Sequence, residues 1–132
     1  MTQEIDLSAF DVSTGAEKGA KLFLRDKHGR QTEEWIELLG ADSKDYQARA
    51  AQQNQARLDR ISQRVSRINE NEILTEQIER LAVATKDWSF KTRDGQKLEV
   101  NAKNAINIYI NSPLIREQAE FFVQNRANFM QA

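Results

Sequence analysis

The chain carries few residues of the types that covalent catalysis uses. His28 is its only histidine, and it has no cysteine. A serine nucleophile would need His28 as its base, and we expect His28 in an exposed turn. Glu33 and Glu34 are adjacent, so on a strand they point to opposite faces and cannot act as an acid–base pair. Glycine-rich phosphate loops and His-Glu-x-x-His are also absent. We therefore predict no enzymatic activity, no cofactor and no metal.

A regular row of arginines is the strongest binding pattern in the sequence. Four arginines recur with three-four-three spacing, which places them along one side of a helix: Arg57, Arg60, Arg64 and Arg67. Such a row could follow a nucleic-acid backbone, or its arginines could pair with carboxylates such as Asp59, Glu70 and Glu72. The net charge is −1, and no aromatic residues accompany the row. The composition therefore argues against nucleic-acid binding and favours a protein-facing or solvated row.

One residue beyond the arginines runs an apolar row with the same spacing. Its members, which share heptad-like positions, are Leu58, Ile61, Val65 and Ile68. A chain of 132 residues cannot always cover such a row. The two rows together form our predicted surface for partner binding or self-association, and we expect weak homo-oligomers through it.

A long helix should carry both rows. Asp42 and Ser43 are capping residues, and the helical pattern runs from Ser43 to Ile68. Residues 69–72 interrupt it, and the apolar period resumes out of phase, so we predict two antiparallel helices with Asn71 capping the second. A single helix over 43–84 is the alternative.

The N-terminal part predicts a flexible arm and a β-hairpin. Residues 1–19 are polar and should be mobile. The strands 20–25 and 33–39 flank a type I turn at 26–30, and one face of the hairpin should lie on helices. A short capped helix over 32–39 is the alternative to the second strand.

Downstream of the long helices, the helical period breaks over residues 85–100. We predict a loop or short hairpin there, with Trp88 filling the gap between helices. A short helix capped by Asn101 should follow over 101–110, although the alternating isoleucines also fit a strand.

The last predicted helix runs from Ser112 to Met130. Ser112 can cap it, and Pro113 fits its first position. Its apolar side includes Phe122, and steps of 100° per residue put Arg126 near the middle of that side. A buried guanidinium needs a carboxylate or carbonyl partner, so removing it should be strongly destabilising.

Taken together, these patterns predict a single domain over 1–132 that is mainly α with a small N-terminal β-hairpin (α+β), a compact bundle of about four helices and a mobile N-terminal arm. No apolar run is long enough to span a bilayer, and no signal peptide is recognisable, so we expect a soluble intracellular protein with no membrane partner.

Several of these residues carry a family resemblance. Trp88, the run Pro113-Leu114-Ile115-Arg116-Glu117-Gln118 and the closing Asn125-Arg126-Ala127-Asn128-Phe129 resemble the tail assembly chaperones of tailed bacteriophages. The resemblance covers Thr85–Met130 and, more weakly, Gly19–Tyr46, where Gly40-Ala41-Asp42-Ser43 is also similar. The motif and structural residues are Trp88, Pro113, Arg116, Phe122, Arg126 and Phe129.

The resemblance implies a non-enzymatic role in the bacterial host cytoplasm. Members of the family bind the tape measure protein, bring in tail tube protein and are absent from the mature virion. It also suggests that Arg126 and Phe129 fasten the last helix to Trp88 and to the preceding short helix. A nucleic-acid-binding protein and a structural tail component are the alternatives.

Overall fold

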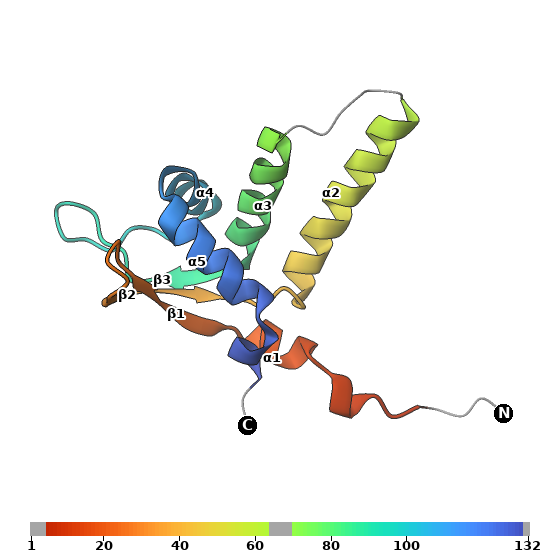
Figure 1. The fold of residues 1–132 in the computed structure, drawn as a ribbon, viewed down its shortest axis with the longest axis horizontal. Helices are drawn as coiled ribbons and strands as arrows, with labels where there is room; N and C mark the ends of the chain where they lie inside the picture. Colours follow the sequence, from red (N-terminus) through yellow and green to blue (C-terminus); the bar gives the residue numbers. More distant parts are fainter. Residues whose placement is uncertain (1–4, 64–69, 131–132) are drawn as a thin grey trace.

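The computed structural model describes residues 5–63 and 70–130 as helices around a small sheet. Its helical segments are η1 (Ser8–Phe10), α1 (Ser13–Lys18), α2 (Lys44–Ser62), α3 (Glu70–Ala84), α4 (Ala102–Asn111), α5 (Pro113–Gln124) and η2 (Arg126–Phe129). The strands are β1 (Ala20–Arg25), β2 (Gln31–Leu38) and β3 (Thr85–Trp88), arranged antiparallel in the order β1-β2-β3. Helices α3, α4 and α5 lie above the sheet in Figure 1. The mainly helical α+β class is confirmed.

The predicted β1–β2 hairpin is confirmed, and the helical alternative for its second half is wrong. The Gly29 N–H donates to the Asp26 carbonyl at 2.9 Å, and Gly29 has a φ of 78°, which glycine adopts without strain. The Asp26 carboxylate accepts from the amides of His28 and Arg30. His28 is exposed in this turn, as expected.

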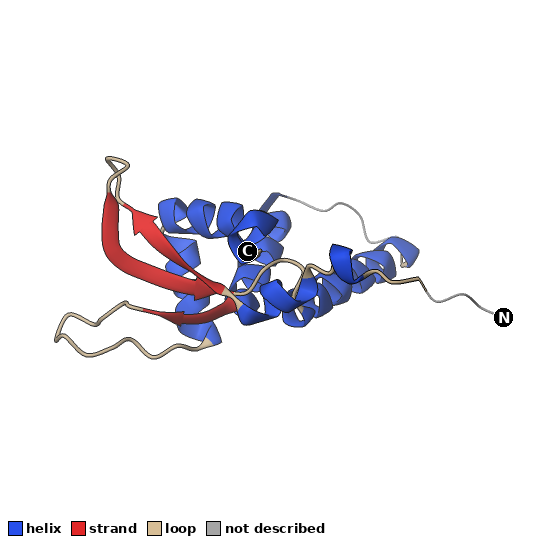
Figure 2. Cartoon of the chain, turned by 90° about the horizontal axis from the view of Figure 1, so that it is seen from below, coloured by secondary structure: helices blue, strands red, loops and turns tan. Residues whose placement is uncertain are grey.

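Residues 85–88 form strand β3, whereas a loop or short hairpin was predicted over 85–100. Its Trp88 lies opposite Ile36 of β2, so residues 85–88 extend the hairpin into a three-stranded sheet. The next segment turns back on itself, with a bridge between Lys91 and Lys97 around Gly95. The predicted short hairpin therefore exists only over this later part (Figure 2).

The core lies between the sheet and the helices. Trp88 is 1% exposed, and its indole N–H donates to the Leu98 carbonyl at 2.9 Å. Tyr109 is also buried and shares a 2.6 Å hydrogen bond with the Thr85 hydroxyl; burial raises the pKa of Tyr109 to about 12. Trp88 thus belongs to a strand, and its side chain lies in a core cluster to which α3, α4 and α5 contribute.

Helices α2 and α3 form an antiparallel pair, so the continuous helix over 43–84 is wrong (Figure 1). Ser43 caps α2 as predicted, accepting from the Tyr46 amide. The helix ends at Ser62, earlier than Ile68; residues 64–69 lie outside the described part. Helix α3 begins at Glu70, so Asn71 lies inside its first turn and is not the predicted N-terminal cap.

The caps of the last two helices are confirmed, but the C-terminal boundary is wrong. Asn101 caps α4 through the Asn104 amide, and Ser112 caps α5 with Pro113 at its first position. The strand alternative for 106–110 is therefore excluded. Helix α5 stops at Gln124 because Asn125 is extended, with φ −90° and ψ 101°, and the 3-10 helix η2 follows.

The N-terminal segment is packed over part of its length. Residues 13–18 form α1, Ala16 is 1% exposed, and the Ala16 carbonyl accepts from the Gly40 amide at 3.0 Å. The predicted arm over 1–19 is therefore wrong from Ser13 onward, and residues 1–4 lie outside the described part. Among the helices described, none is long and apolar enough to cross a membrane.

Candidate binding surfaces

The loop between β2 and α2 joins three distant parts of the chain. Backbone amides of successive residues bond to different elements: Leu39 to the Ala84 carbonyl at 2.7 Å, Gly40 to Ala16 in α1 at 3.0 Å, and Ala41 to Val123 in α5 at 3.1 Å. We call residues 39–43 the junction loop. Because these hydrogen bonds join backbone groups, they hold α1 and the end of α5 against the junction loop.

Arg126 binds this junction loop from the surface. Its Nε and Nη2 donate to the two carboxylate oxygens of Asp42 at 2.8 and 3.0 Å. The Asp42 hydrogen bond and charge raise the pKa of Arg126. The predicted carboxylate partner exists, but the predicted burial is wrong, since the Arg126 side chain is 64% exposed. The helical register that placed it inward ends at Gln124.

Phe129 provides the buried contact at the same place. It is 6% exposed, and its ring meets Phe122 edge-on with centroids 5.5 Å apart. A Cβ at Gly40 would lie 3.1 Å from the Phe129 ring, so the glycine allows this close approach. Arg126 and Phe129 therefore fasten the C-terminus to the junction loop and α1, and the expected attachment to Trp88 and α4 is wrong.

We expect only a small loss of stability on Arg126→Ala. Exposed ion pairs contribute little because water and salt screen them and both side chains lose freedom, even when the pair is bidentate. The thermal midpoint should fall slightly, and Asp42→Asn should lower it by a similar amount. The double variant should not exceed either single change, because both remove the same contact. A decrease as large as that of a core truncation would contradict this assignment.

Arg116 also has a structural contact, since its Nη1 donates to the Tyr109 carbonyl at 2.8 Å near the end of α4. With Pro113 at the start of α5 and Trp88 in the core, the residues of the family resemblance mainly hold the fold together.

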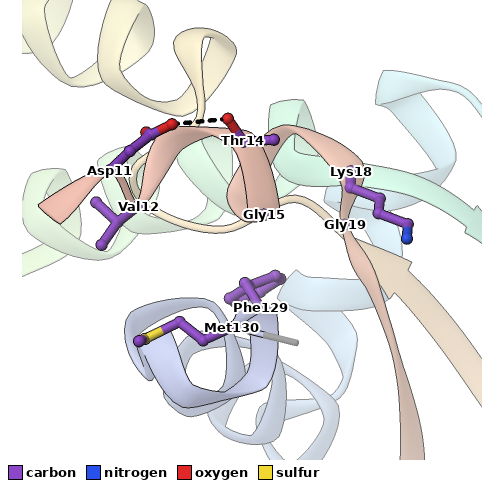
Figure 3. Close-up of a pocket in the computed structure, with 8 residues that line it drawn as sticks. All are labelled: Asp11, Val12, Thr14, Gly15, Lys18, Gly19, Phe129 and Met130. Carbon is purple, nitrogen blue, oxygen red and sulfur yellow. Dashed lines mark hydrogen bonds between the residues drawn. The ribbon is translucent and has the colours of Figure 1, made fainter. Parts of the chain in front are cut away.

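A hollow of about 360 Å³ lies between α1 and η2 (Figure 3). The Asp11 carboxylate beside it accepts from the Ser13 and Thr14 hydroxyls, and these bonds lower the pKa of Asp11 to about 2. That carboxylate also accepts from the Ser13 amide at the start of α1. It stays ionised at neutral pH, so it is a poor general acid or base. Phe129 and Met130 form the opposite wall.

The arginines of α2 are paired across to α3. Arg57 lies 2.5 Å from Glu76, Arg60 lies 2.7 Å from Glu72, and Arg49 pairs with Glu79. This supports the carboxylate-pairing interpretation for Arg57 and Arg60, with Glu72 among the partners expected. Arg64 and Arg67 lie outside the described residues.

The apolar residues beside these arginines are uncovered. Leu58 is 59% exposed and Ile61 is 63% exposed. Of the predicted surface, the structure thus leaves the apolar residues Leu58 and Ile61 open to solvent, whereas Arg57 and Arg60 are turned to α3. Val65 and Ile68 fall outside the described part.

A second apolar surface was missed by sequence reasoning. A groove of about 380 Å³ runs between β1 and α5, with Phe23 (45% exposed) and Phe121 (76% exposed) among its lining residues. The side-chain amide of Gln118 lies at the wall of the groove. It accepts from the backbone N–H of Arg25 at 2.7 Å and donates to the backbone carbonyl of Arg25 at 2.9 Å. A signal was present in the sequence: adjacent phenylalanines on one helix cannot both face the core, and Phe122 was assigned inward.

No family model, curated protein or solved structure matches the chain.

Within residues 5–63 and 70–130, no group of three or more histidine or acidic side chains could hold a metal ion. What the described surface offers is apolar contact area, at the α2–α3 pair and at the β1–α5 groove. Both are features of binding surfaces in proteins.

Proposed function

We propose that this protein is a non-enzymatic phage tail assembly chaperone, which binds the tape measure protein and helps recruit tail tube subunits. In this proposal it acts in the host cytoplasm and is absent from the mature virion. One observation carries the proposal: two stretches of the family resemblance, distant in sequence, meet at the junction loop. Asp42 pairs with Arg126, and Gly40 makes room for Phe129. If the two segments resembled the family only by chance, there would be no reason for them to contact each other.

The β1–α5 groove is the surface that we assign to the tape measure protein. Phe121 is the most exposed phenylalanine of its helix, and with Phe23 it lines a hollow rather than a flat face. Large aromatic side chains in such positions supply much of the affinity in protein interfaces. Asn125 and Asn128 also line the groove and add side-chain amides that can bond to a partner's backbone, whereas the Gln118 side chain is already bonded to Arg25.

Coexpression with the tape measure protein tests this proposal. The wild-type chain should keep the tape measure protein soluble and copurify with it. Phe121→Asp should weaken that binding at least tenfold, because it puts a charge into an apolar contact without altering the core. Ile110→Asp, at a side chain 55% exposed on α4, is the matched control and should bind normally.

Other outcomes point to other functions. If the tape measure protein stays insoluble with the wild-type chain, the proposal fails. Detection of the chain in purified virions by mass spectrometry would indicate a structural tail component. A shift of labelled DNA or RNA that disappears steeply with salt would indicate a nucleic-acid-binding protein; the pairing of Arg57 and Arg60 with glutamates argues against it.

A further inference from the structure

An uncharged row of exposed residues follows one flank of α2. Ala51, Asn54, Leu58 and Ile61 are spaced three, four and three residues apart, the spacing of a coiled-coil contact row, and all four are exposed. Leu58 and Ile61 are the most apolar of them, at 59% and 63% exposed. We call these four residues the α2 flank.

Helix α3 does not cover this flank, because α2 presents a different side to it. Gln53 donates to the Glu76 carbonyl at 2.9 Å, and Arg57 and Arg60 bond to glutamates of α3, so these residues mark the side that faces α3. At 100° per residue, Leu58 lies about 140° around the helix from Gln53, and Ile61 about 80°. The polar contacts therefore hold the helix pair together and leave its apolar flank to solvent.

Helix α3 adds an apolar residue on the same side. Ile73 follows Glu72, the partner of Arg60, by one residue, and so lies about 100° further around α3. Because the helices are antiparallel, this rotation leads to the side on which Leu58 and Ile61 lie, at the level of the Arg60–Glu72 pair. Ile73 is 54% exposed. Two helices thus contribute to one apolar surface.

The charges around this surface suit a second copy of the chain. Two identical surfaces bring identical charges together, and like charges in contact are strongly unfavourable. None of the four residues of the α2 flank is charged: the arginines of α2 are turned to α3, and Asp45 and Asp59 lie on the opposite side by helical position. Lys44 is on the same side as the flank, but it is the first residue of α2, at the other end of the helix from Leu58 and Ile61. Asn54 is a neutral polar residue within the row, and across a two-fold axis such a residue can bond to its own copy.

We propose that the α2 flank and Ile73 form the contact between two copies of this chain, with the two α2–α3 pairs packed about a two-fold axis. The apolar surface is small beside the ~800 Å² per partner of a stable interface, so the dimer is weak and depends on concentration. This inference is independent of the proposed function, because it concerns a different surface and a different partner.

Sedimentation equilibrium of the full chain over micromolar to millimolar concentrations tests this proposal. The wild-type chain should pass from monomer to dimer, and added salt should not weaken the association, because the contact is uncharged. Ile61→Glu and Ile73→Glu should each raise the dissociation constant at least tenfold. Both side chains are exposed, so the variants should keep the wild-type circular dichroism and thermal midpoint.

Ile110→Glu serves as the control, since it adds the same charge at another exposed isoleucine. It should dimerise like the wild type. A wild-type chain that is monomeric at millimolar concentration overturns the proposal, and so does a dimer that Ile61→Glu leaves unchanged or that Ile110→Glu weakens equally. A monomer whose Ile61→Glu variant loses the tape measure protein would assign the flank to that partner instead.

Discussion

Trp88→Ala is expected to destabilise the fold by about 3 to 5 kcal/mol, the range seen when a large buried aromatic side chain is truncated. Trp88 is 1% exposed and contributes the largest fully buried side chain of the core. The change also leaves the Leu98 carbonyl without the indole N–H that donates to it at 2.9 Å. Urea unfolding followed by circular dichroism would measure the loss.

Trp88→Phe separates the two contributions to this loss. Phenylalanine removes the N–H donor and part of the ring but keeps much of the apolar volume, so its cost should be clearly smaller than that of alanine. Phe121→Ala is a useful reference, because that ring is 76% exposed and its truncation should change the unfolding free energy little. Equal midpoints for Trp88→Ala and the wild type would contradict the packing described for β3.

The second large effect is expected at Gly15. A Cβ on this residue would lie 2.0 Å from the Phe129 carbonyl oxygen and 3.1 Å from its carbonyl carbon. Alanine within a helix normally stabilises relative to glycine by roughly 0.5 to 1 kcal/mol. Here the contact with backbone should reverse that sign, and we expect Gly15→Ala to destabilise by about 1 to 3 kcal/mol. Thermal or urea unfolding gives the sign directly.

Hydrogen exchange locates the effect of this substitution. If α1 is displaced from η2, the Gly40 amide, which donates to Ala16 in α1, should exchange faster. The neighbouring Ala41 amide donates to Val123 in α5 and should keep its protection, so it is an internal control. A stabilised variant, or equal acceleration at both amides, would show that α1 does not depend on the contact with Phe129.

Several elements were predictable from the sequence because their causes are local. Ser43, Asn101 and Ser112 each cap the following helix by accepting from the amide three residues ahead, and Pro113 fits only the first turn. The β1–β2 turn depends on Asp26 and on a glycine at positive φ. The alternation of the two flanking strands was then enough to predict the hairpin.

The apolar row on α2 was also visible in the sequence, but what covers it depends on the other helices. Sequence spacing alone allows α3 to pack on Leu58 and Ile61, which is the usual outcome for an amphipathic pair. Instead the arginines face α3, because glutamates at matching heights pair with them. The relative rotation of two helices is set by all of their mutual contacts, so spacing within one of them does not determine it.

The largest error concerned the C-terminus, where a helical period was extended beyond its valid range. Steps of 100° per residue apply only while the backbone stays helical, and the chain becomes extended at Asn125. Beyond α5, Arg126 bonds to Asp42 of the junction loop, which lies 84 positions away in the sequence. By itself the sequence determined the hairpin and the starts of α2, α4 and α5. It also led to a partner for Arg126, although the burial from which that partner was argued is wrong. Only the tertiary structure decided which carboxylate it is, that the pair lies at the surface, and that Phe129 rather than Arg126 is buried, because contacts between residues far apart in sequence depend on how the whole chain is folded.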